Sequence, residues 1–551
     1  MSLPNSSGRL DVIVIGGGPA GSTAATMLAK HGYSVLLLER SEFPRDHVGE
    51  SLLPASIPVL EELGVIDEVQ QAGFLPKWGA TMIWGMDKEP WSWYFRETNE
   101  QYPNSYQVWR PEFDKILLDN SRKHGVDVRE KHRVVHVLFE GSKAVGVKYV
   151  DDFGDSKVAN AEYIVDASGQ QNVLGSQLNT KKEDPFFRNL AVYGYYTGVP
   201  KLPEPAHNNI FIESYENGWC WNIPLHNGQN SIGIVVDGAS NQNSIQELGA
   251  EKFYTGELSK ASYISRLLET AELQSVPSVI KDWSYSCSPM VGDGYILVGD
   301  AACFIDPLFS SGVHLALMSG VLSSTYINTA KSDETLGLAS RSVYEDLYMK
   351  EYGHFRELAR LFYSSNRSVE SYFWEARRVL DADTSLSPRN AFIQAVAGQS
   401  TRGYERVVLQ HGDLPKSFLG SVNQIESEVQ RRSEEFTQLS VDGGSSLSKS
   451  LSVIPKLSEG VVLERKPVLG EGIFTWGYVL NTQNRNNGLE CSELVAVLIS
   501  KMDGQSTLGD LLDLFKERTP EGDWPNLRQA LMNSLRLLYI DGVIERFSSE
   551  A

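Results

Sequence analysis

The sequence contains few of the residues that build disulfide networks and metal centres. Its 551 residues include four cysteines, and no two of them form a CxxC pair. Histidine and cysteine do not cluster at the spacing of metal ligands either. We therefore expect reduced structural thiols and no metal site. The four cysteines are Cys220, Cys287, Cys303 and Cys491.

Long apolar runs and an excess of positive charge are also absent. No run of about eighteen apolar residues, the length that crosses a bilayer, occurs, and no basic, apolar leader precedes the first expected strand near Leu10. The formal net charge is -20, which opposes nonspecific binding to the phosphates of nucleic acid or anionic lipid. We expect a soluble, cytoplasmic protein with no nucleic-acid or membrane partner.

The start of the chain has the pattern of a dinucleotide-binding unit. β-branched residues run to Ile15, an alanine-rich helix follows, and a second strand, "SVLLLE", ends at Glu39. Gly16, Gly18 and Gly21 form GxGxxG between the first strand and the helix. Backbone amides and the helix N-terminus can face a pyrophosphate there, and Glu39 can bind a ribose hydroxyl.

Two later segments have the same strand-and-glycine pattern. They are "EYIVDASG" at 162–169 and the stretch 294–320, and we expect both strands to return to the first sheet. Aromatic, alternating segments lie between them. Asn217-Gly218 and Asn227-Gly228 are hairpin signals, which predict an antiparallel meander.

From Tyr344 onward, aromatic residues recur with the period of a helix. This pattern is more often a core stripe than a substrate pocket, and both explanations stay open. The stripe consists of Tyr344, Tyr348, Tyr352, Phe355 and Phe362.

The stretch "GWCWNIPL" at 218–225 contains two tryptophans one residue apart. Alternate residues of a strand share a face, so Trp219, Trp221 and Ile223 point one way and form an aromatic wall. Without further context, core packing is the simpler explanation of the pair.

Four segments together resemble one enzyme superfamily. They are the GxGxxG turn, "GESLLP" at 49–54, "WRPEFDKIL" at 109–117 and "GDAACFIDPLFSSG" at 299–312. The combination is similar to the flavin monooxygenase superfamily with the hydroxybenzoate-hydroxylase-like fold. The resemblance implies an α/β protein with a Rossmann-like FAD-binding domain of the GR2 type, an inserted antiparallel substrate sheet and a helical region.

The same resemblance implies which residues contact FAD. Residues that match Arg110 and Asp300 contact the cofactor in that superfamily, and the segment 307–312 runs beside the isoalloxazine ring. A helix cap is the structural alternative for Asp300. The full set expected at the cofactor is Gly16, Gly18, Pro19, Ala20, Gly21, Glu39, Arg40, Gly49, Glu50, Ser51, Arg110, Asp300, Pro307 and Gly312.

The complete WxWxIP motif resembles the signature of the flavin-dependent halogenases, and the resemblance covers about residues 10–380. In that family the wall of Trp219 and Trp221 keeps the substrate from the flavin C4a-hydroperoxide, which therefore meets halide. The resulting hypohalous acid travels through a tunnel to a lysine. Ser311 and the Gly312 amide would flank the halide, chloride or bromide.

Lys77, in "FLPKWGA", matches the position of the family's lysine. Its ammonium can hydrogen-bond hypohalous acid, or its neutral amine can become a haloamine. The second route needs a pKa lowered by burial from the usual value of roughly 10.4. The structural alternative is a solvated surface lysine in a turn.

The segment "PLFSSGV" lacks a residue typical of halogenases of free tryptophan. Those enzymes carry a glutamate two positions before the residue that matches Ser311, where this chain has Phe309. Without this general base, a substrate activated by its own ring, such as a phenol or pyrrole, is favoured. The segment 360–378 also resembles a region of phenol and pyrrole halogenases, some of which act on carrier-bound substrates. Its aromatic residues, expected to line the pocket, are Phe362, Tyr363, Tyr372, Phe373 and Trp374.

The sequence shows no second βαβ unit for a nicotinamide cofactor, and the Asp-Gly motif that helps related hydroxylases bind NAD(P)H is missing. We therefore expect a separate NAD(P)H-dependent flavin reductase to supply FADH2, with molecular oxygen as the oxidant. The predicted protein is a two-component halogenase of natural-product biosynthesis. The alternatives are an aromatic hydroxylase, a geranylgeranyl-reductase-like enzyme of the same fold, or a catalytically silent flavoprotein.

Three domains are expected along the chain. Residues 1–380 form the FAD-binding and halogenase core, with the substrate sheet largely in 75–110 and 185–290. Residues 381–450 form a helical extension and a linker rich in serine and glycine.

Residues 451–551 resemble a small winged-helix domain. Thr507 is a cap-like residue with Asp510 three positions on, and a leucine stripe ends at Gly542 before the strand "GVIERF". Because this segment has no strong basic run, contact with a protein or formation of a lid is favoured over DNA binding.

Overall fold

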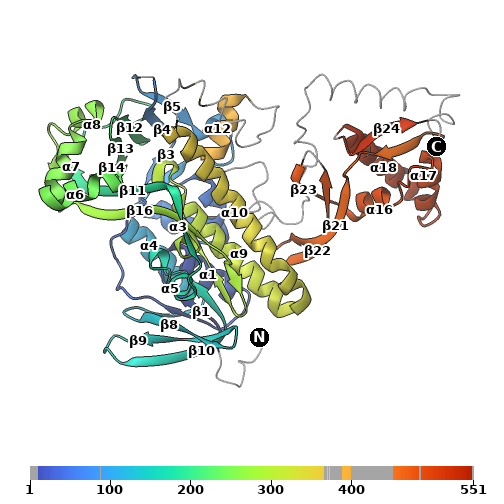
Figure 1. Ribbon diagram of the computed structural model, residues 1–551, viewed down its shortest axis with the longest axis horizontal. Coiled ribbons are helices and arrows are strands. Elements are labelled where there is room, and N and C mark those ends of the chain that lie inside the picture. Colours follow the sequence, from blue (N-terminus) through green and yellow to red (C-terminus); the bar gives the residue numbers. More distant parts are fainter. Residues whose placement is uncertain are drawn as a thin grey trace. The chain divides into compact units, whose positions relative to one another are not determined.

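A computed structural model describes two compact units of the chain, one within residues 10–398 and one within 451–548 (Figure 1). Phe373, Trp374 and most of the predicted linker lie outside the described residues. The described residues are 10–86, 88–364, 369, 372, 387–398, 451–482, 485–540 and 542–548.

Eight strands of the first unit form a sheet that carries the N-terminal glycine turn. β1 (Leu10–Ile15) pairs in parallel with β2 (Val35–Leu38) on one side and with β10 (Ser156–Asp166) on the other. β18 (Tyr295–Leu297) pairs in parallel with β10, which confirms that both later strand-and-glycine segments return to this sheet. The other strands are β7 (Asp127–Arg129), β8 (Arg133–Glu140), β9 (Lys143–Val150) and β17 (Val291–Gly292).

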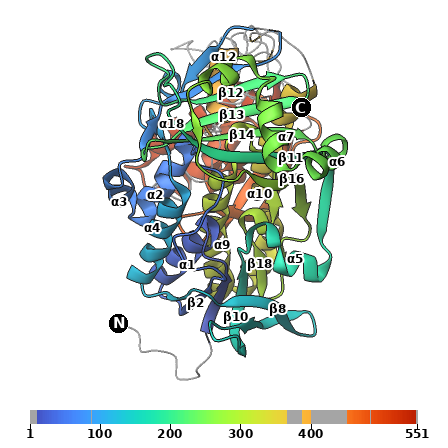
Figure 2. The same cartoon turned by 90° about the vertical axis from the view of Figure 1, so that its left-hand side faces the viewer.

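Helices pack on this sheet because its central strands are apolar along their length. Residues 12–14 are fully buried, as expected for parallel strands covered on both faces. α1 (Pro19–Lys30) packs against α9 (Gly312–Ser332), and Figure 2 shows both near β10 and β18. A Cβ on Gly320 would lie 2.8 Å from a carbonyl oxygen of α1, so this glycine allows the close packing.

Nine described strands form a second sheet, in the order β19-β16-β11-β14-β13-β12-β4-β5 with β15 beside β11. β12, β13 and β14 are consecutive antiparallel neighbours, which confirms the predicted meander. The strands are β4 (Gly79–Ile83), β5 (Trp91–Tyr94), β11 (Lys181–Thr197), β12 (Ile210–Tyr215), β13 (Gly218–Pro224), β14 (Gln229–Asp237), β15 (Glu272–Leu273), β16 (Ser278–Cys287) and β19 (Cys303–Phe304). A separate pair consists of β3 (Leu75–Lys77) and β6 (Ser105–Gln107).

Helices α6, α7 and α8 gather beside the second sheet (Figure 1). Cys220 and Ile234 of the sheet and Tyr254 of α7 belong to the core that these helices close. The remaining helices of this unit are α2 (Ile57–Leu63), α3 (Ile66–Gln71), α4 (Arg110–Lys123), α5 (Val173–Leu178), α6 (Gly238–Leu248), α7 (Ala250–Leu258), α8 (Ser262–Leu267), α10 (Glu334–Ser364) and α12 (Pro388–Val396).

The aromatic stripe that begins at Tyr344 is part of the core of the first unit. All five of its residues lie on α10 and are buried. The hydroxyls of Tyr344 and Tyr348 donate to the backbone carbonyls of Leu297 and Gly299, which ties α10 to the segment after β18. The core explanation is therefore correct for this stripe, although Phe362 at its end also contacts aromatic residues near the site.

In the second unit, a strand from the start and a strand from the end of the unit pair with each other beside a helical core. β20 (Ile454–Leu457) pairs with β24 (Ile544–Ser548), and Thr507 and Asp510 form the expected capping box. A three-stranded meander precedes the helices, and the winged-helix interpretation of this unit stays a prediction. The remaining elements are β21 (Val462–Leu469), β22 (Phe474–Thr482), β23 (Arg485–Cys491), α16 (Glu493–Ser500), α17 (Leu508–Lys516) and α18 (Trp524–Ile540).

Two features are absent from the described residues. None of their helices has the length and apolar character needed to span a bilayer. They also contain no group of three or more His, Cys, Asp or Glu side chains arranged to hold a metal ion.

The backbone of β14 makes room for a tryptophan of β13. Trp221 and Gly233 are paired across the two strands, and a Cβ on Gly233 would lie 2.1 Å from the indole ring. The orientation of Trp221 therefore depends on a glycine at this position.

Gly233→Ala should lower the free energy of unfolding by about 1–3 kcal/mol, because the methyl group overlaps the Trp221 ring. Gly256→Ala on α7 is the control, since its Cβ would meet nothing within 4 Å. That variant should be neutral or more stable by up to about 1 kcal/mol. Urea unfolding of both variants tests this, and a Gly233→Ala protein as stable as the wild type would contradict it.

Candidate active site

A cavity of about 690 Å³ in the first unit contains contributions from both sheets. This volume lies within the range of small-molecule sites, roughly 300–1,000 Å³. The predicted site residues that line it are Gly16, Gly18, Pro19, Ala20, Glu39, Arg40, Gly49, Glu50, Ser51, Arg110, Trp219, Trp221, Asp300, Pro307 and Gly312. Of the predicted cofactor, halide and lysine residues, Gly21, Lys77 and Ser311 do not belong to the cavity lining. Phe362, Tyr363 and Tyr372, which are predicted to line the substrate pocket, do not line this cavity either.

The glycine turn brings the start of α1 against the end of β1. Gly16 has φ +100°, and a Cβ on Gly21 would lie 2.0 Å from the Gly16 carbonyl oxygen, so Gly21 has a packing role. Gly18 is the N-cap of α1, where no side chain caps the helix and no acidic residue occupies the first turn. The first amides of α1 therefore keep their capacity to bind an anion.

Arg45 adds a positive charge to this turn. Its guanidinium lies 3.4 Å from Asp114, and a Cβ on Gly18 would lie 3.3 Å from its Nη2. Burial lowers the pKa of Arg45, and the charge of Asp114 opposes this shift. Nη1, the atom nearest Asp114 Oδ2, is buried and forms no hydrogen bond, whereas the side chain as a whole is 19% exposed and lines the cavity. The guanidinium can therefore reach a phosphate oxygen.

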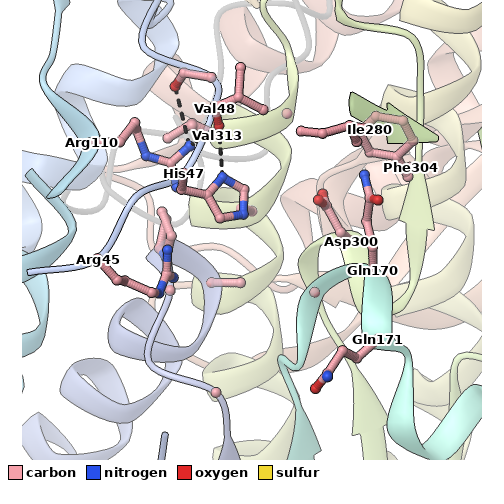
Figure 3. Close-up of a pocket in the computed structure, with 18 of the residues that line it drawn as sticks. Arg45, His47, Val48, Arg110, Gln170, Gln171, Ile280, Asp300, Phe304 and Val313 are labelled. Atoms are coloured by element: carbon pink, nitrogen blue, oxygen red, sulfur yellow. Dashed lines mark hydrogen bonds between the residues drawn. The ribbon is translucent and has the colours of Figure 1, made fainter. Parts of the chain in front are cut away.

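Figure 3 shows Arg45, His47 and Arg110 on one side of the pocket, with Asp300 on the other. The Arg110 guanidinium donates two hydrogen bonds to Asp114, and its Nη1 donates to the Val48 carbonyl at 2.7 Å. Arg110 thus shapes the pocket wall while most of its donors are engaged within the protein.

Burial raises the pKa of two carboxyl groups at the cavity. Burial raises the pKa of Asp300 to about 6, although the charge of Arg110 opposes this. Asp300 lies inside the 3-10 turn Gly299–Ala301, which begins after Val298, so it does not cap this turn. Burial also raises the pKa of Glu50, whose Oε1 accepts a hydrogen bond from Tyr195 at 3.0 Å.

Glu39 stabilises the glycine turn directly. Its Oε2 accepts a hydrogen bond from the Gly17 amide at 2.7 Å, and its Oε1 accepts one from the Ser41 amide at 2.8 Å. Because a carboxylate has about four lone-pair positions, it can still accept a ribose hydroxyl.

The residues around the cavity fit FAD on these observations. A glycine turn that a Cβ would fill, open helix amides and the guanidinium of Arg45 at the cavity lining together form a site for a pyrophosphate. The cavity continues from this turn to the tryptophans and to the start of α9, as expected for an extended cofactor.

Two tryptophans form one wall of the cavity. Trp219, Trp221 and Ile223 all line it, whereas Cys220 packs into the core on the opposite face of β13. The two indole rings lie 5.9 Å apart. Trp84 lies 6.3 Å from Trp219 and does not line the cavity, so aromatic residues continue behind the wall.

An aromatic cluster lies behind this wall, and Phe309 belongs to it. The Phe309 ring lies 5.1 Å from Phe362 and 6.3 Å from Phe392 of α12. Phe362 also lies 5.9 Å from Trp84, and Trp93 lies 5.2 Å from Phe392. The residue that replaces a glutamate in this chain therefore stands among apolar rings.

Lys77 is buried, with 2% of its surface exposed. Its Nζ donates to the Leu52 carbonyl oxygen at 2.9 Å and lies 5.6 Å from the centre of the Phe95 ring. Burial lowers the pKa of Lys77 to about 7. The alternative of a solvated surface lysine is therefore wrong.

Polar atoms lie between the cavity and the strand of Lys77. Ser51 lines the cavity and forms an isolated bridge with Gln107, while Ser105 is the cross-strand partner of Lys77. Ser51 Oγ, Ser105 Oγ and Gln107 Oε1 are buried without a hydrogen-bond partner. These orphaned atoms are suited to a polar molecule that passes from the cavity toward Lys77.

The fold and the cavity define an FAD-binding oxidoreductase, and comparison with known proteins gives its family. A family model described as tryptophan halogenase matches residues 11–104 and 96–413. The tryptophan 2-halogenase of Chondromyces crocatus is 35% identical over 386 residues, which cover 69% of this chain and 72% of that protein. The chain belongs to the flavin-dependent halogenases.

Other relatives extend this similarity. A 1H-pyrrole-2-carbonyl-(peptidyl-carrier protein) chlorinase of Pseudomonas fluorescens is 31% identical, over 67% of this chain and 87% of that protein. The solved structure of the myxobacterial chondrochloren halogenase CndH is 40% identical with a TM-score of 0.63, and covers 73% of this chain and 92% of that chain. The halogenase CmlS is 28% identical with a TM-score of 0.68, over 96% of this chain and 95% of its own.

Arg45 is a candidate site residue that no sequence motif marks. This arginine stands in the charged stretch "ERSEFPRDH" after β2, where no motif distinguishes it from Arg40. The path of the chain after β2 brings Arg45 back over the turn before α1, and this contact has no signature in residue spacing.

Arg45→Met should weaken FAD binding about tenfold or more, because a charge-assisted hydrogen bond contributes about 1.5–3 kcal/mol. Titration of the apoprotein with FAD, followed by flavin fluorescence, measures the dissociation constant. Arg266→Met is a matched control, since Arg266 belongs to α8 and does not line the cavity. An unchanged dissociation constant for Arg45→Met would exclude the proposed phosphate contact.

Lys77→Met should stabilise the protein most at and below about pH 7, since the wild type must then bury a charged amine. The unfolded chain keeps its lysine proton up to about pH 10.4, so the wild type gains stability as the pH rises from about 7 to about 10. The difference in the free energy of unfolding between Lys77→Met and the wild type should therefore shrink between about pH 7 and about pH 10. Urea unfolding across this range measures it, with the exposed Lys252→Met as control, and a constant advantage would contradict burial of the amine.

Proposed function

We propose that this chain is a two-component halogenase that chlorinates or brominates an electron-rich aromatic substrate, a phenol or a pyrrole, in natural-product biosynthesis. The observation that carries this proposal is the buried amine of Lys77, which lies outside the cavity that Trp219 and Trp221 line. When bound, FADH2 from a separate NAD(P)H-dependent flavin reductase would supply two electrons to molecular oxygen. The halide would supply the other two and become hypohalous acid, and the second oxygen atom would leave as water.

The protein's residues have separate tasks in this scheme. The glycine turn and Arg45 hold the cofactor phosphates, and the two tryptophans exclude the aromatic substrate from the cofactor cavity. Ser311 is the N-cap of α9, which has no side-chain cap and no acidic residue in its first turn. The amides that begin with Gly312 can therefore attract a halide ion at the edge of the cavity.

Lys77 receives the oxidised halogen. Hypohalous acid is a small polar molecule that can hydrogen-bond to Ser51, Gln107 and Ser105 on its way to the amine. With a pKa of about 7, Lys77 is present in both protonation states near neutral pH. Its ammonium can hydrogen-bond hypohalous acid, or its neutral amine can form a haloamine with release of water, so both routes proposed for this lysine remain available.

The surroundings of Phe309 favour a substrate that needs no strong general base. Its neighbours Phe362 and Phe392 offer apolar contact to an aromatic ring and no carboxylate. A phenol or pyrrole stabilises the cation formed by attack of the halogen and then loses its proton readily. Similarity to a chlorinase that acts on a carrier-bound pyrrole supports a substrate attached to a carrier protein over a free one.

Lys77→Met should lower the yield of halogenated product about a hundredfold or more, whereas oxidation of FADH2 by oxygen should stay within about twofold of the wild type. Mass spectrometry of candidate phenols and pyrroles, free and carrier-bound, with chloride and with bromide, measures the product. The exposed Lys252→Met is the control.

Product mass also separates the alternative reactions of this fold. Halogenation replaces a hydrogen by a halogen, hydroxylation adds an oxygen, and a reductase adds hydrogen. A Lys77→Met enzyme that still halogenates would remove the proposed role of the lysine, and a wild-type enzyme that only hydroxylates would overturn the proposed function.

A further inference from the structure

A hydroxyl group of α10 connects the tryptophan wall with the segment Pro307–Gly312, which we call the halide segment. The Tyr363 hydroxyl accepts a hydrogen bond from Trp219 Nε1 at 2.5 Å and donates one to Asp306 Oδ2 at 2.6 Å. Asn189 Nδ2 of β11 also donates to this hydroxyl, at 3.2 Å. Tyr363 is near the end of α10, so four segments that are distant in sequence meet at one oxygen atom.

Asp306 immediately precedes the halide segment in the chain, and its side chain caps the first turn of that segment. Its Oδ1 accepts a hydrogen bond from the Leu308 amide at 3.0 Å, as the N-cap of the 3-10 turn Pro307–Phe309. Its Oδ2 also accepts a hydrogen bond from Asn189 Nδ2 at 2.9 Å. The side chain is 2% exposed, so these donors replace the water that a carboxylate normally binds.

Core packing alone does not account for this arrangement. Burying a carboxylate has a desolvation cost of several kcal/mol, and apolar residues of similar volume would pack against an indole without it. Burial raises the pKa of Asp306 to about 6, which reflects the desolvation of its charged form. The directional contacts have a geometric effect that apolar packing lacks, because they fix the rotation of the Trp219 ring relative to the halide segment.

We propose that Tyr363 and Asp306 are positioning residues that hold the wall and the halide segment in one fixed arrangement. This inference rests on the proposed halogenase function. Trp219 separates the cavity from the aromatic cluster, and Gly312 lines the same cavity. When the link is intact, each oxidised halide is formed beside a closed wall and proceeds toward Lys77.

Loss of the link should uncouple flavin oxidation from halogenation. In Tyr363→Phe the indole N–H loses its acceptor in a buried setting, so the ring can turn and the wall opens. Oxygen is then reduced by FADH2 to hydrogen peroxide, which yields FAD and leaves the halide unoxidised. Halogenated product per FADH2 oxidised should fall at least about threefold, and hydrogen peroxide should rise by the missing amount.

Tyr344→Phe is the matched control. It removes the same atom from the same helix, and the Tyr344 hydroxyl donates to the Leu297 carbonyl oxygen, away from the wall. Its product per FADH2 should equal that of the wild type. Asp306→Asn retains a good cap but replaces one carboxylate oxygen by a donor, so its coupling should lie between those of the wild type and Tyr363→Phe.

A measurement without the cofactor tests the contact itself. In the wild type labelled with 15N-tryptophan, the indole resonance that disappears in Trp219→Phe belongs to Trp219. This resonance should shift upfield in Tyr363→Phe and stay in place in Tyr344→Phe, because only the first variant removes the hydrogen-bond acceptor.

The outcomes separate the two proposals. A shifted Trp219 resonance with a lowered product ratio supports the positioning role. An unshifted resonance, or a normal ratio in Tyr363→Phe, overturns that role and leaves the halogenase function intact. If the wild type forms no halogenated product from any of the substrates, the proposed function fails, and the coupling role fails with it.

Discussion

Two indole rings on one face of β13 form the boundary on which the arrangement of this site depends. The strand alternates its side chains, so Cys220 contributes to the core below α7 while Trp219 and Trp221 face the cavity. Gly233 on β14 leaves space for Trp221, and the hydroxyl of Tyr363 accepts the indole proton of Trp219. The wall is therefore held from a neighbouring strand and from a distant helix.

Burial of ionisable groups is the second feature of the site. Lys77 and Asp306 are buried and Asp300 is half-buried at the cavity, and desolvation shifts the pKa of each toward neutrality. Such groups reduce stability, so their presence around one cavity and one wall is typical of a catalytic site. Each has a different environment: Lys77 contacts a backbone carbonyl, Asp300 faces the charge of Arg110 across the pocket, and Asp306 accepts several hydrogen bonds.

Local patterns predicted much of the fold and of the cofactor site. The glycine turn, the meander of β12–β14 and the return of β10 and β18 to the first sheet depend on residue spacing and turn chemistry, which act over short distances. The resemblance to halogenases drew attention to Lys77, and one of the two routes left open for it, formation of a haloamine, needed burial of the amine. Arg45 and Tyr363 could not be assigned their contacts in the same way, since neither contact follows from spacing along the chain.

The sequence by itself determined the α/β class, the glycine cradle, the family and the shared face of Trp219 and Trp221, because these follow from periodicity and from contiguous motifs. Only the tertiary structure decided that Lys77 is buried, that Arg45 lies over the glycine turn, and that Tyr363 bridges the wall to Asp306. Burial and side-chain hydrogen bonds depend on which distant segments pack together, and that packing places α10, β13 and the halide segment at a single hydroxyl.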